Sequence, residues 1–304
     1  MIRLWAWGVD VQEATNKAAT LIEALDYIRQ YHGRIVVVKL GGSVMDTPEA
    51  ERSLLQDVVF LHYVGMKPVL VHGGGKEISA AMDEAGLEPH FVNGLRYTDD
   101  KTLNIVEQVL CGRINRRIVE TLAALGAEAI GLHSLSTCVL FAERMYDETD
   151  DGRRLDLGFV GRLTSVNAKV LRLLCEADTI PVLAPVARDP AGGKLNINGD
   201  TAAGAVAAAL PAEKLVMMSD THGIRADLSD EESFYSSLDR KRIQAFMADG
   251  VIAKGMVPKA QACLQALDAG VGKAHIIDGR KPHSLLLEIF SHHGVGTEIV
   301  VNDG

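Results

Sequence analysis

Two glycine turns and two distant lysines give this chain the residue types that phosphoryl transfer requires. Lys39 lies at the end of an apolar run, shortly before the turn Gly41–Gly42. A second apolar run ends in Gly73–Gly75, and Lys259 ends the segment Gly255–Lys259 far along the chain. Glycines let backbone N–H groups approach phosphate oxygens, and lysines offset the charge that develops as a phosphoryl group moves. The pattern therefore predicts a phosphate site, although P-loop and dinucleotide-binding motifs are absent.

Three polar residues could hold a small polar or acidic substrate near such a site. Arg96 follows a glycine, and a guanidinium can clamp a carboxylate in bidentate fashion. A surface arginine beside an N-cap threonine, Thr98, is the alternative interpretation. Asn196 and Asn198 could donate hydrogen bonds to a polar ligand, and Asp200 begins an alanine-rich run that it could merely cap. The low bulk of that run predicts close approach to neighbouring backbone.

Short β-branched runs alternate with stretches of helical spacing, which is typical of an α/β fold. Because the strand runs are apolar throughout, we expect a mainly parallel central sheet sandwiched between helices. The predicted strands are Ile35–Leu40, Pro68–Val71, Ala129–Leu132, Ile180–Leu183, Lys214–Met218, His275–Ile277 and Glu298–Val301. The predicted helices are Glu49–Val64, Thr98–Leu125, Val166–Ala177, Thr201–Leu210, Pro258–Ala269 and one that begins near Lys76.

Breaks in this alternation predict two lobes and an N-terminal extension. Residues 1–32 form the extension, in which Val11–Tyr31 reads as an amphipathic helix. It either packs on its own lobe or reaches a neighbouring subunit. The N-lobe spans residues 33–190 and the C-lobe residues 191–304, with the turn-rich segment Ala187–Lys194 at the junction. Glu143–Arg162 predicts a β-hairpin or a flap over the site, with a plain surface loop as the alternative.

Composition excludes several classes of function. The net charge is −9 and only 5% of residues are aromatic, so we expect no nucleic-acid partner. The four cysteines are scattered, and no histidine or cysteine spacing indicates a metal site. No apolar stretch is long enough to span a membrane, and the first residues do not resemble a signal peptide. We expect a cytoplasmic protein.

Six segments, in this order, resemble the amino-acid kinase family, and within it the acetylglutamate kinases. The resemblance covers nearly the whole chain, and Asp156–Gly161 is similar to the hairpin of that family. The segments that carry it are Val37–Gly42, Val71–Gly75, Asn93–Arg96, Asn196–Ala203, Gly255–Lys259 and Ala274–Arg280.

The resemblance implies ATP-dependent phosphorylation of the γ-carboxylate of N-acetyl-L-glutamate, a step of arginine biosynthesis. It implies that Lys39 and Lys259 flank the transferring phosphoryl group and that Asp200 holds both lysines. ATP is expected with Mg²⁺, and Asp220 is expected in the nucleotide site. The resemblance implies that Arg96, Asn196 and Asn198 bind the acyl substrate. It also implies that the phosphoryl oxygens accept hydrogen bonds from the N–H groups of Gly41, Gly42, Gly74 and Gly75.

The chain also resembles the arginine-inhibited members of the family. An N-terminal helix such as Val11–Tyr31 interlaces dimers into hexamers in those members, so we expect a homo-oligomer, either a dimer or a hexamer. The C-terminal pattern of those members matches His275, Glu288 and Gly294. The resemblance implies that L-arginine is an effector, and a carboxylate such as Glu288 is a suitable partner for it.

The chain departs from the family pattern in places that keep two other functions open. Tyr97 stands next to the expected arginine clamp, and the turn 133–138 lacks the usual polar sequence. Gly199 replaces a common alanine, and the loop 221–227 is unusual. One alternative is another amino-acid kinase with a different acyl or carbamoyl acceptor. The other is a catalytically weak sensor of arginine or nitrogen status.

Overall fold

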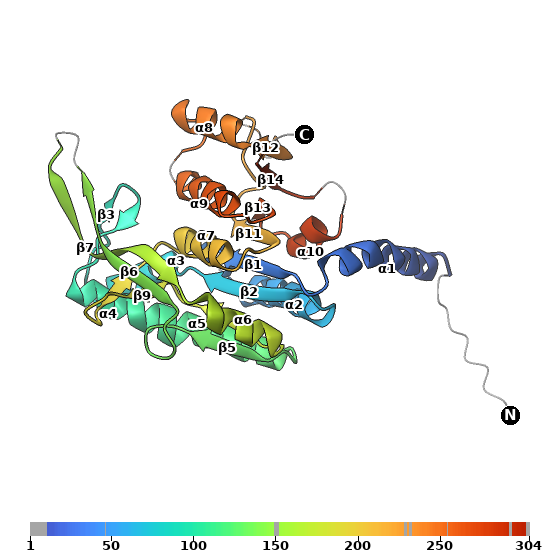
Figure 1. The fold of residues 1–304 in the computed structure, drawn as a ribbon, viewed down its shortest axis with the longest axis horizontal. Coiled ribbons are helices and arrows are strands. Elements are labelled where there is room, and N and C mark those ends of the chain that lie inside the picture. Colours follow the sequence, from blue (N-terminus) through green and yellow to red (C-terminus); the bar gives the residue numbers. More distant parts are fainter. Residues whose placement is uncertain are drawn as a thin grey trace.

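The computed structural model describes residues 11–45, 47–148, 152–227, 230, 233–253, 255–291 and 294–301 of the 304-residue chain. Its centre is one eight-stranded sheet with the order β12-β14-β13-β11-β1-β2-β8-β5 (Figure 1). All neighbouring pairs are parallel except β13 and β14. The bounds are β1 Ile35–Leu40, β2 Lys67–His72, β5 Ala129–Leu132, β8 Ile180–Leu183, β11 Lys214–Ser219, β12 Ser237–Asp239, β13 Lys273–Asp278 and β14 Thr297–Val300.

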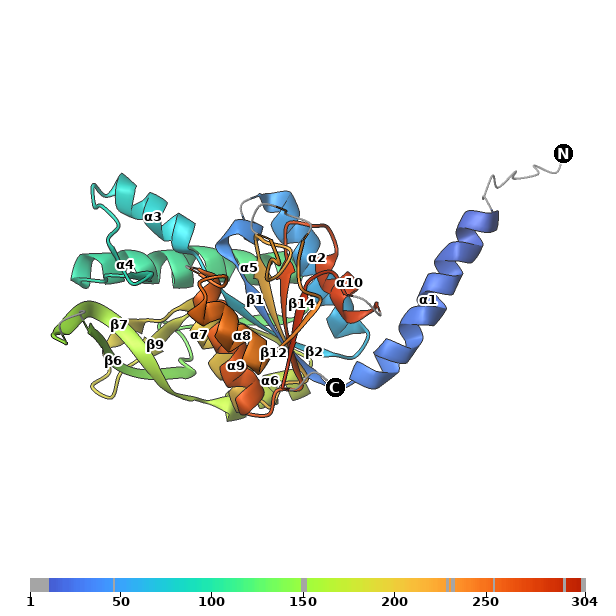
Figure 2. The ribbon, with the colours of Figure 1, turned by 90° about the horizontal axis from the view of Figure 1, so that it is seen from above.

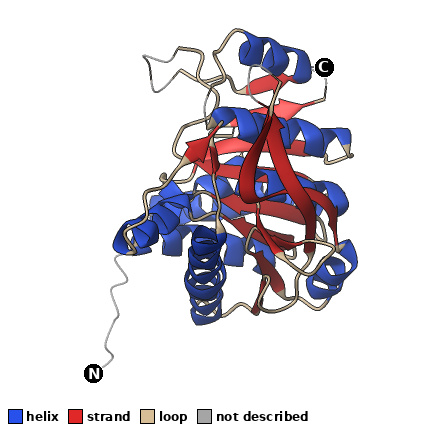
Figure 3. Cartoon of the chain, turned by 90° about the vertical axis from the view of Figure 1, so that its left-hand side faces the viewer, coloured by secondary structure: helices blue, strands red, loops and turns tan. Residues whose placement is uncertain are grey.

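Helices cover both faces of this sheet (Figure 3), which confirms the predicted sandwich. Successive side chains of a strand point to opposite faces, and β1 is buried on both. Val37 therefore packs in one apolar cluster with α6 and α7, while Val36 and Val38 pack in another with α2 and α5. The helices are α2 Pro48–Tyr63, α3 Gly75–Glu84, α5 Asn115–Ala124, α6 Ala168–Glu176, α7 Gly199–Ala209, α8 Arg240–Ala248, α9 Met256–Asp268 and α10 Ser284–Ile289.

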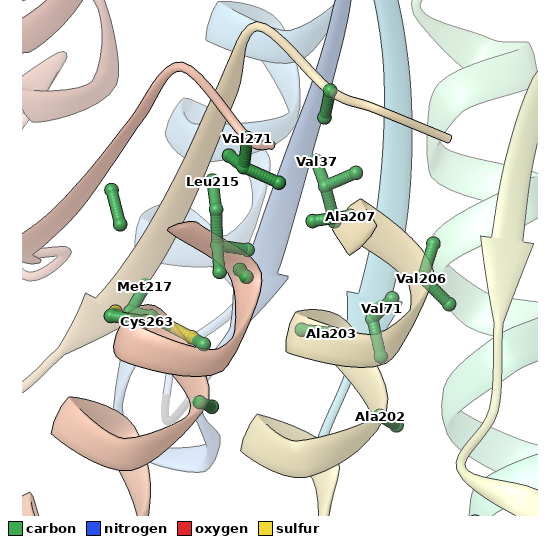
Figure 4. Packing of buried hydrophobic residues seen from close by; sticks show 14 of the residues in the cluster. Val37, Val71, Ala202, Ala203, Val206, Ala207, Leu215, Met217, Cys263 and Val271 are labelled. Atoms are coloured by element: carbon green, nitrogen blue, oxygen red, sulfur yellow. The ribbon is translucent and has the colours of Figure 1, made fainter. Parts of the chain in front are cut away.

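The alanine-rich α7 packs closely on α9, as its low bulk predicted (Figure 4). A Cβ at Gly204 would lie 2.9 Å from the carbonyl oxygen of Ala262 on α9. Ala203 and Ala207 are fully buried in the same cluster, next to Val37 and Leu215. Small side chains thus let α7 lie directly on the sheet, which places its first residues at the carboxyl end of β1.

The predicted helix Thr98–Leu125 differs from the structure in two ways. It begins at Asp100, because Asp99 and not Thr98 is the N-cap and accepts a hydrogen bond from the backbone N–H of Thr102. Its middle is the π-helical segment η2, Gln108–Ile114, between α4, Asp100–Glu107, and α5. The spacing of apolar residues cannot distinguish a π turn from an α turn. One extra residue in a turn shifts the row of apolar residues on the helix face only locally.

A small four-stranded barrel lies beyond the carboxyl edge of the sheet. The segment predicted as a hairpin forms β6, Leu140–Glu148, and β7, Arg154–Val166, which pair antiparallel. The hairpin prediction is confirmed for the described residues, while residues 149–151 lie outside them. Two further strands close the barrel: β9, Val186–Arg188, and β10, Lys194–Asn196. The short strands β3, Phe91–Val92, and β4, Leu95–Arg96, lie beside it, and the 3₁₀ turn η1, Gly42–Met45, follows β1.

The N-terminal helix α1, Val11–Tyr31, projects from the body of the molecule (Figure 2). Only Tyr31 is buried, and Leu21 and Ile22 are about 70% exposed. The first ten residues of the predicted extension lie outside the described part. The central sheet contains strands of both predicted lobes without a break. The structure therefore does not test the lobe boundaries, which stay a prediction. No helix among the described residues is long and apolar enough to cross a membrane.

Candidate active site

Lys39, Asp200 and Lys259 form one ion triad at the carboxyl end of β1. The Nζ of Lys39 lies 2.7 Å from Oδ1 of Asp200, and the Nζ of Lys259 lies 2.8 Å from Oδ2. Lys39 comes from β1, Asp200 from the first turn of α7 and Lys259 from the first turn of α9. The structure therefore brings together three residues that are up to 220 positions apart in the sequence (259 − 39).

The triad is almost completely buried, and its charges depend on one another. Burial raises the pKa of the Asp200 carboxyl, but Lys39 and Lys259 lower it more, so the carboxyl stays ionised. Burial lowers the pKa of the Lys39 ammonium, Asp200 opposes this shift, and Lys259 adds to it. Asp200 is therefore the group that lets two ammonium groups share one site.

Asp200 does not cap α7, because Asn198 does. The Oδ1 of Asn198 accepts hydrogen bonds from the backbone N–H groups of Asp200 and Thr201, at 2.9 and 3.0 Å. This capping leaves the Asp200 carboxylate available for the two lysines. Gly199 lies close to the glycine turns, since a Cβ there would meet the carbonyl oxygen of His72 and the Cε of Lys39 at 3.6 Å.

The two glycine turns lie next to each other and face the triad. The N–H of Gly73 donates to the carbonyl oxygen of Leu40 at 2.9 Å, which joins the turn after β2 to the end of β1. The helix α3 begins at Gly75 with no side-chain cap on its N-cap residue, Gly74. The N–H groups of the first turn of a helix have no partner within the helix, and the helix dipole favours an anion there.

A cavity of about 210 Å³ joins these features to the predicted substrate residues. Arg96 lines it, is 8% exposed, and donates to the carbonyl oxygen of Gly75 at 2.9 Å and to Oγ of Ser79 at 2.8 Å. Asn196 also lines it and donates to Oγ1 of Thr98 at 3.2 Å. The other predicted residues in its lining are Lys39, Gly42, Gly74, Gly75, Asn198 and Asp200.

Three predicted active-site residues, Gly41, Lys259 and Asp220, do not line this cavity, although Lys259 contacts Asp200, which does. The carbonyl oxygen of Gly41 accepts a hydrogen bond from the N–H of Val44, which starts the turn η1. Asp220 follows β11, and its charge raises the pKa of Lys39, so the carboxylate lies within electrostatic reach of the site. Tyr97 also lies outside the lining and contacts His90 edge to face, with ring centroids 6.2 Å apart.

A second cavity, of about 630 Å³, continues from the first under the β6–β7 hairpin. The two cavities share Gly94, Leu95, Val160 and Asn198 in their linings. The rest of its wall includes Arg162 of β7 and Val257 of α9. The hairpin thus borders the site, as the flap interpretation requires. Among the described residues, no group of three histidine, cysteine or acidic side chains has the arrangement of a metal site.

The residues predicted as an effector site come together at the opposite end of the sheet. The Nδ1 of His275 lies 2.6 Å from Oε1 of Glu288, and the N–H of Val295 donates to Oε2 at 2.6 Å. His275, Glu288 and Gly294 line a cavity of about 330 Å³. Gly294 has a φ of +59°, and a Cβ there would lie 2.8 Å from the Glu288 carboxylate. Tyr31, Lys214 and Glu298 line the same cavity.

Sequence reasoning did not find Lys214 or His72. The Nζ of Lys214 lies 3.2 Å from Nε2 of His275, and Lys214 is 4% exposed at the start of β11. His72 is fully buried at the end of β2, immediately before the second glycine turn. Each is a polar residue at the end of an otherwise apolar strand, and that position was the signal available in the sequence.

Three comparisons agree with this geometry. The model of the amino acid kinase family matches residues 34–278. An acetylglutamate kinase of Symbiobacterium thermophilum is 47% identical over 95% of this chain and 99% of its own length. One from Methanocaldococcus jannaschii is 44% identical over 96% of this chain and 99% of its own length.

Solved structures share the fold. An N-acetylglutamate synthase from Neisseria gonorrhoeae, complexed with coenzyme A and N-acetyl-glutamate, has a TM-score of 0.83 at 26% identity. The match covers 94% of this chain but only 64% of the synthase, so it concerns part of that protein. A carbamate kinase from Giardia lamblia bound to AMP-PNP has a TM-score of 0.63 at 17% identity, which shows the fold alone. By its family match and its identities over nearly the full chain, this chain belongs to the amino acid kinase family.

Proposed function

We propose that this chain transfers the γ-phosphoryl group of ATP to the γ-carboxylate of N-acetyl-L-glutamate, as a step of arginine biosynthesis. The observation that carries the proposal is the pair of lysines on one buried carboxylate, beside two glycine turns with N–H groups available. The acetylglutamate kinases that match the chain over nearly its full length support this acceptor.

The geometry suits a reaction in which two anions must meet. The acceptor is already a carboxylate, so no strong base is needed. Lys39 and Lys259 offset the charge that the transferring group spreads over its oxygens, and the N–H groups of Gly42, Gly74 and Gly75 donate to the same oxygens. Asp200 contacts neither reactant in this scheme. It holds both ammonium groups in place and raises the pKa of Lys39 against the effect of burial.

The residues fit ATP with Mg²⁺. The cationic triad and the uncapped start of α3 suit a polyphosphate. When bound, Mg²⁺ offsets charge on the phosphate oxygens, where few protein carboxylates are required. Besides Asp200, Asp220 is an acidic residue within electrostatic reach of Lys39, and we assign it to the nucleotide side of the site.

The decisive assay measures acyl phosphate formation by the purified protein with several acceptors. We expect turnover with N-acetyl-L-glutamate that exceeds turnover with glutamate, aspartate, carbamate and UMP by at least about 100-fold, because a missing hydrogen-bonding or packing group costs this much in a specific site. Preference for another acceptor would favour a different amino-acid kinase. ATP turnover with none of them would favour a sensor.

Alanine at Arg96 should mainly weaken binding of the acidic substrate. A charge-assisted hydrogen bond contributes about 1.5–3 kcal/mol, so the KM for N-acetyl-L-glutamate should rise about 10–100-fold while kcat changes less. Steady-state kinetics on Arg96→Ala and Arg96→Lys test this, with Arg116→Ala as a control because Arg116 pairs with Glu120 on the surface. An unchanged KM in both Arg96 variants would show that the clamp is elsewhere.

We also propose that the chain assembles into a homo-oligomer through α1. The helix projects from the body with Leu21 and Ile22 exposed, and a second copy of the same helix is the partner that would cover them. A dimer or a hexamer satisfies the proposal, and a monomer in analytical ultracentrifugation at micromolar concentration contradicts it.

L-Arginine is the effector that we propose for the cavity around Glu288. The carboxylates of Glu288 and Glu298 suit a guanidinium, and Tyr31 at the end of α1 lines the same cavity. Burial raises the pKa of the Glu288 carboxyl, but His275, the N–H of Val295 and Lys214 together lower it more, so the carboxyl is ionised for such a ligand.

Millimolar arginine should therefore inhibit the wild-type enzyme, and Glu288→Gln should remove most of that inhibition. Losing one charge-assisted contact corresponds to an increase of about 10–100-fold in the half-inhibitory concentration. Basal turnover should stay close to that of the wild type, since the cavity is separate from the triad. Glu120→Gln is the control, and equal inhibition of all three proteins would contradict the assignment.

A further inference from the structure

His72 is fully buried at the end of β2 and touches the glycine turn that follows it. Its Nδ1 lies 2.9 Å from the carbonyl oxygen of Gly73, and its Nε2 lies 3.2 Å from Nδ2 of Asn115. A carbonyl oxygen can only accept, so Nδ1 carries the proton and donates it. Nε2 is then the acceptor for the amide of Asn115, and both contacts fix one neutral tautomer.

Asn115 is itself held by the sheet. Its Nδ2 also donates to the carbonyl oxygen of Val182 on β8 at 2.9 Å, and Asn115 is 1% exposed. On β5, a Cβ at Gly131 would lie only 2.1 Å from Oδ1 of Asn115, so this position has room only for glycine. The amide is thus confined between two strands and has little freedom to turn away from His72.

The π-helical segment η2 also packs against the glycine turn that His72 contacts. Asn115 follows directly after η2, and Leu110 and Ile114 of η2 pack against Gly74. A Cβ at Gly74 would lie 2.5 Å from Ile114 and 2.6 Å from Leu110. π-Helical turns occur often at functional sites. Here the segment presents two apolar side chains to Gly74 and, one residue later, the amide that holds His72.

We infer that His72, held by Asn115, is a positioning residue for phosphoryl transfer. By donating to the carbonyl oxygen of Gly73, it fixes the peptide plane between Gly73 and Gly74 and so aims the N–H of Gly74, beside that of Gly75, at the phosphoryl oxygens. The inference rests on the proposed function, because it assigns those N–H groups to the transferring group. His72 touches no reactant and acts only through the turn.

The surroundings of His72 keep the ring neutral. Burial lowers its pKa to about 4, and nearby Arg117, His133 and Lys39 oppose a further positive charge. The backbone carbonyl of Gly73 acts in the other direction but does not prevail. The tautomer therefore persists through the pH range in which the enzyme would work, and the turn keeps one orientation.

Three variants test this role, because asparagine and glutamine each keep one nitrogen position of the ring and phenylalanine keeps neither. Asparagine places its amide nitrogen near the position of Nδ1, whereas glutamine reaches the position of Nε2. We expect His72→Asn to retain kcat within about 5-fold, and His72→Gln and His72→Phe to lose about 30–100-fold, as misplaced groups do. The KM for N-acetyl-L-glutamate should stay within about 3-fold, because the N–H groups act mainly in the transition state. Equal losses in all three variants, or a loss confined to KM, would overturn the inference.

A second measurement is made on the wild-type protein, and a variant serves only to assign the signal. ¹⁵N NMR of the histidine-labelled wild-type protein should show a ring with Nδ1–H and an unprotonated Nε2 from pH 8 to pH 5.5, assigned through its loss in His72→Asn. An Nε2–H tautomer, or protonation within this range, would overturn the inference. Val58→Ala, a buried change on α2, controls for lost stability in the kinetics. A wild-type protein that phosphorylates no acceptor would refute the proposed function, while the tautomer could still be judged.

Discussion

Alanine at Lys39 is expected to lower turnover by about 10²–10³-fold, the usual cost of removing one group that stabilises the transition state. The Nζ of Lys39 lies 2.7 Å from Oδ1 of the buried Asp200. Lys39 lines the same cavity as the predicted substrate residues. Lys259 is already held at the other oxygen of Asp200, so it does not move in to replace Lys39. Binding of N-acetyl-L-glutamate should change little, since that role falls to Arg96 and Asn196.

Rapid-quench kinetics with saturating ATP measure the effect, and calorimetry measures binding of the acyl substrate. Lys259→Ala should behave in the same way. The matched control is Lys67→Ala, because Lys67 lies on the neighbouring strand β2 and pairs with Asp178 outside the site. Since the two catalytic lysines share one carboxylate, the double variant should lose less than the product of the two single losses. Near-normal turnover in either single variant would show that its lysine has been misassigned.

The sequence predicted those parts of the site that depend on strand ends. Apolar strands followed by glycines must end at the same edge of a parallel sheet, so the two turns could be placed together without coordinates. Lys39 and Gly73–Gly75 belong to this class. Lys259 could be added only through the resemblance to a family, because the packing of α9 on α7 decides where that lysine lies.

The remaining parts of the site and fold depend on tertiary packing, which leaves no local pattern in the sequence. Asn198 and Asp200 are both acceptable helix caps, and only the structure shows that Asn198 takes that role and leaves Asp200 for the lysines. The π turn before Asn115 leaves no mark in the apolar spacing, so the contact between Asn115 and His72 could not be anticipated. The barrel strands β9 and β10 are three residues long, too short for alternation to reveal.

Asparagine at Asp200 is expected to reduce kcat/KM by about 10²–10³-fold at pH 8, although neither reactant touches this residue. The substitution keeps the size of the side chain but removes the charge that holds two buried ammonium groups. Removing one partner of a buried ion pair costs about 3–5 kcal/mol, so the free enzyme should also unfold more easily. Asp178→Asn, which removes a surface carboxylate, should do neither.

The pH dependence of the Asp200→Asn variant separates loss of charge from loss of geometry. In the wild type, Asp200 is the main influence that raises the pKa of Lys39, while burial and Lys259 lower it. Without the carboxylate, the pKa of Lys39 must fall further, and part of the enzyme loses the proton as pH rises. Acid restores the ammonium, so kcat/KM of the variant, which reports the free enzyme, should increase relative to wild type as pH falls from 9 to 6. A constant ratio across this range would mean that Asp200 acts by shape alone, and that the charge of Lys39 does not depend on it.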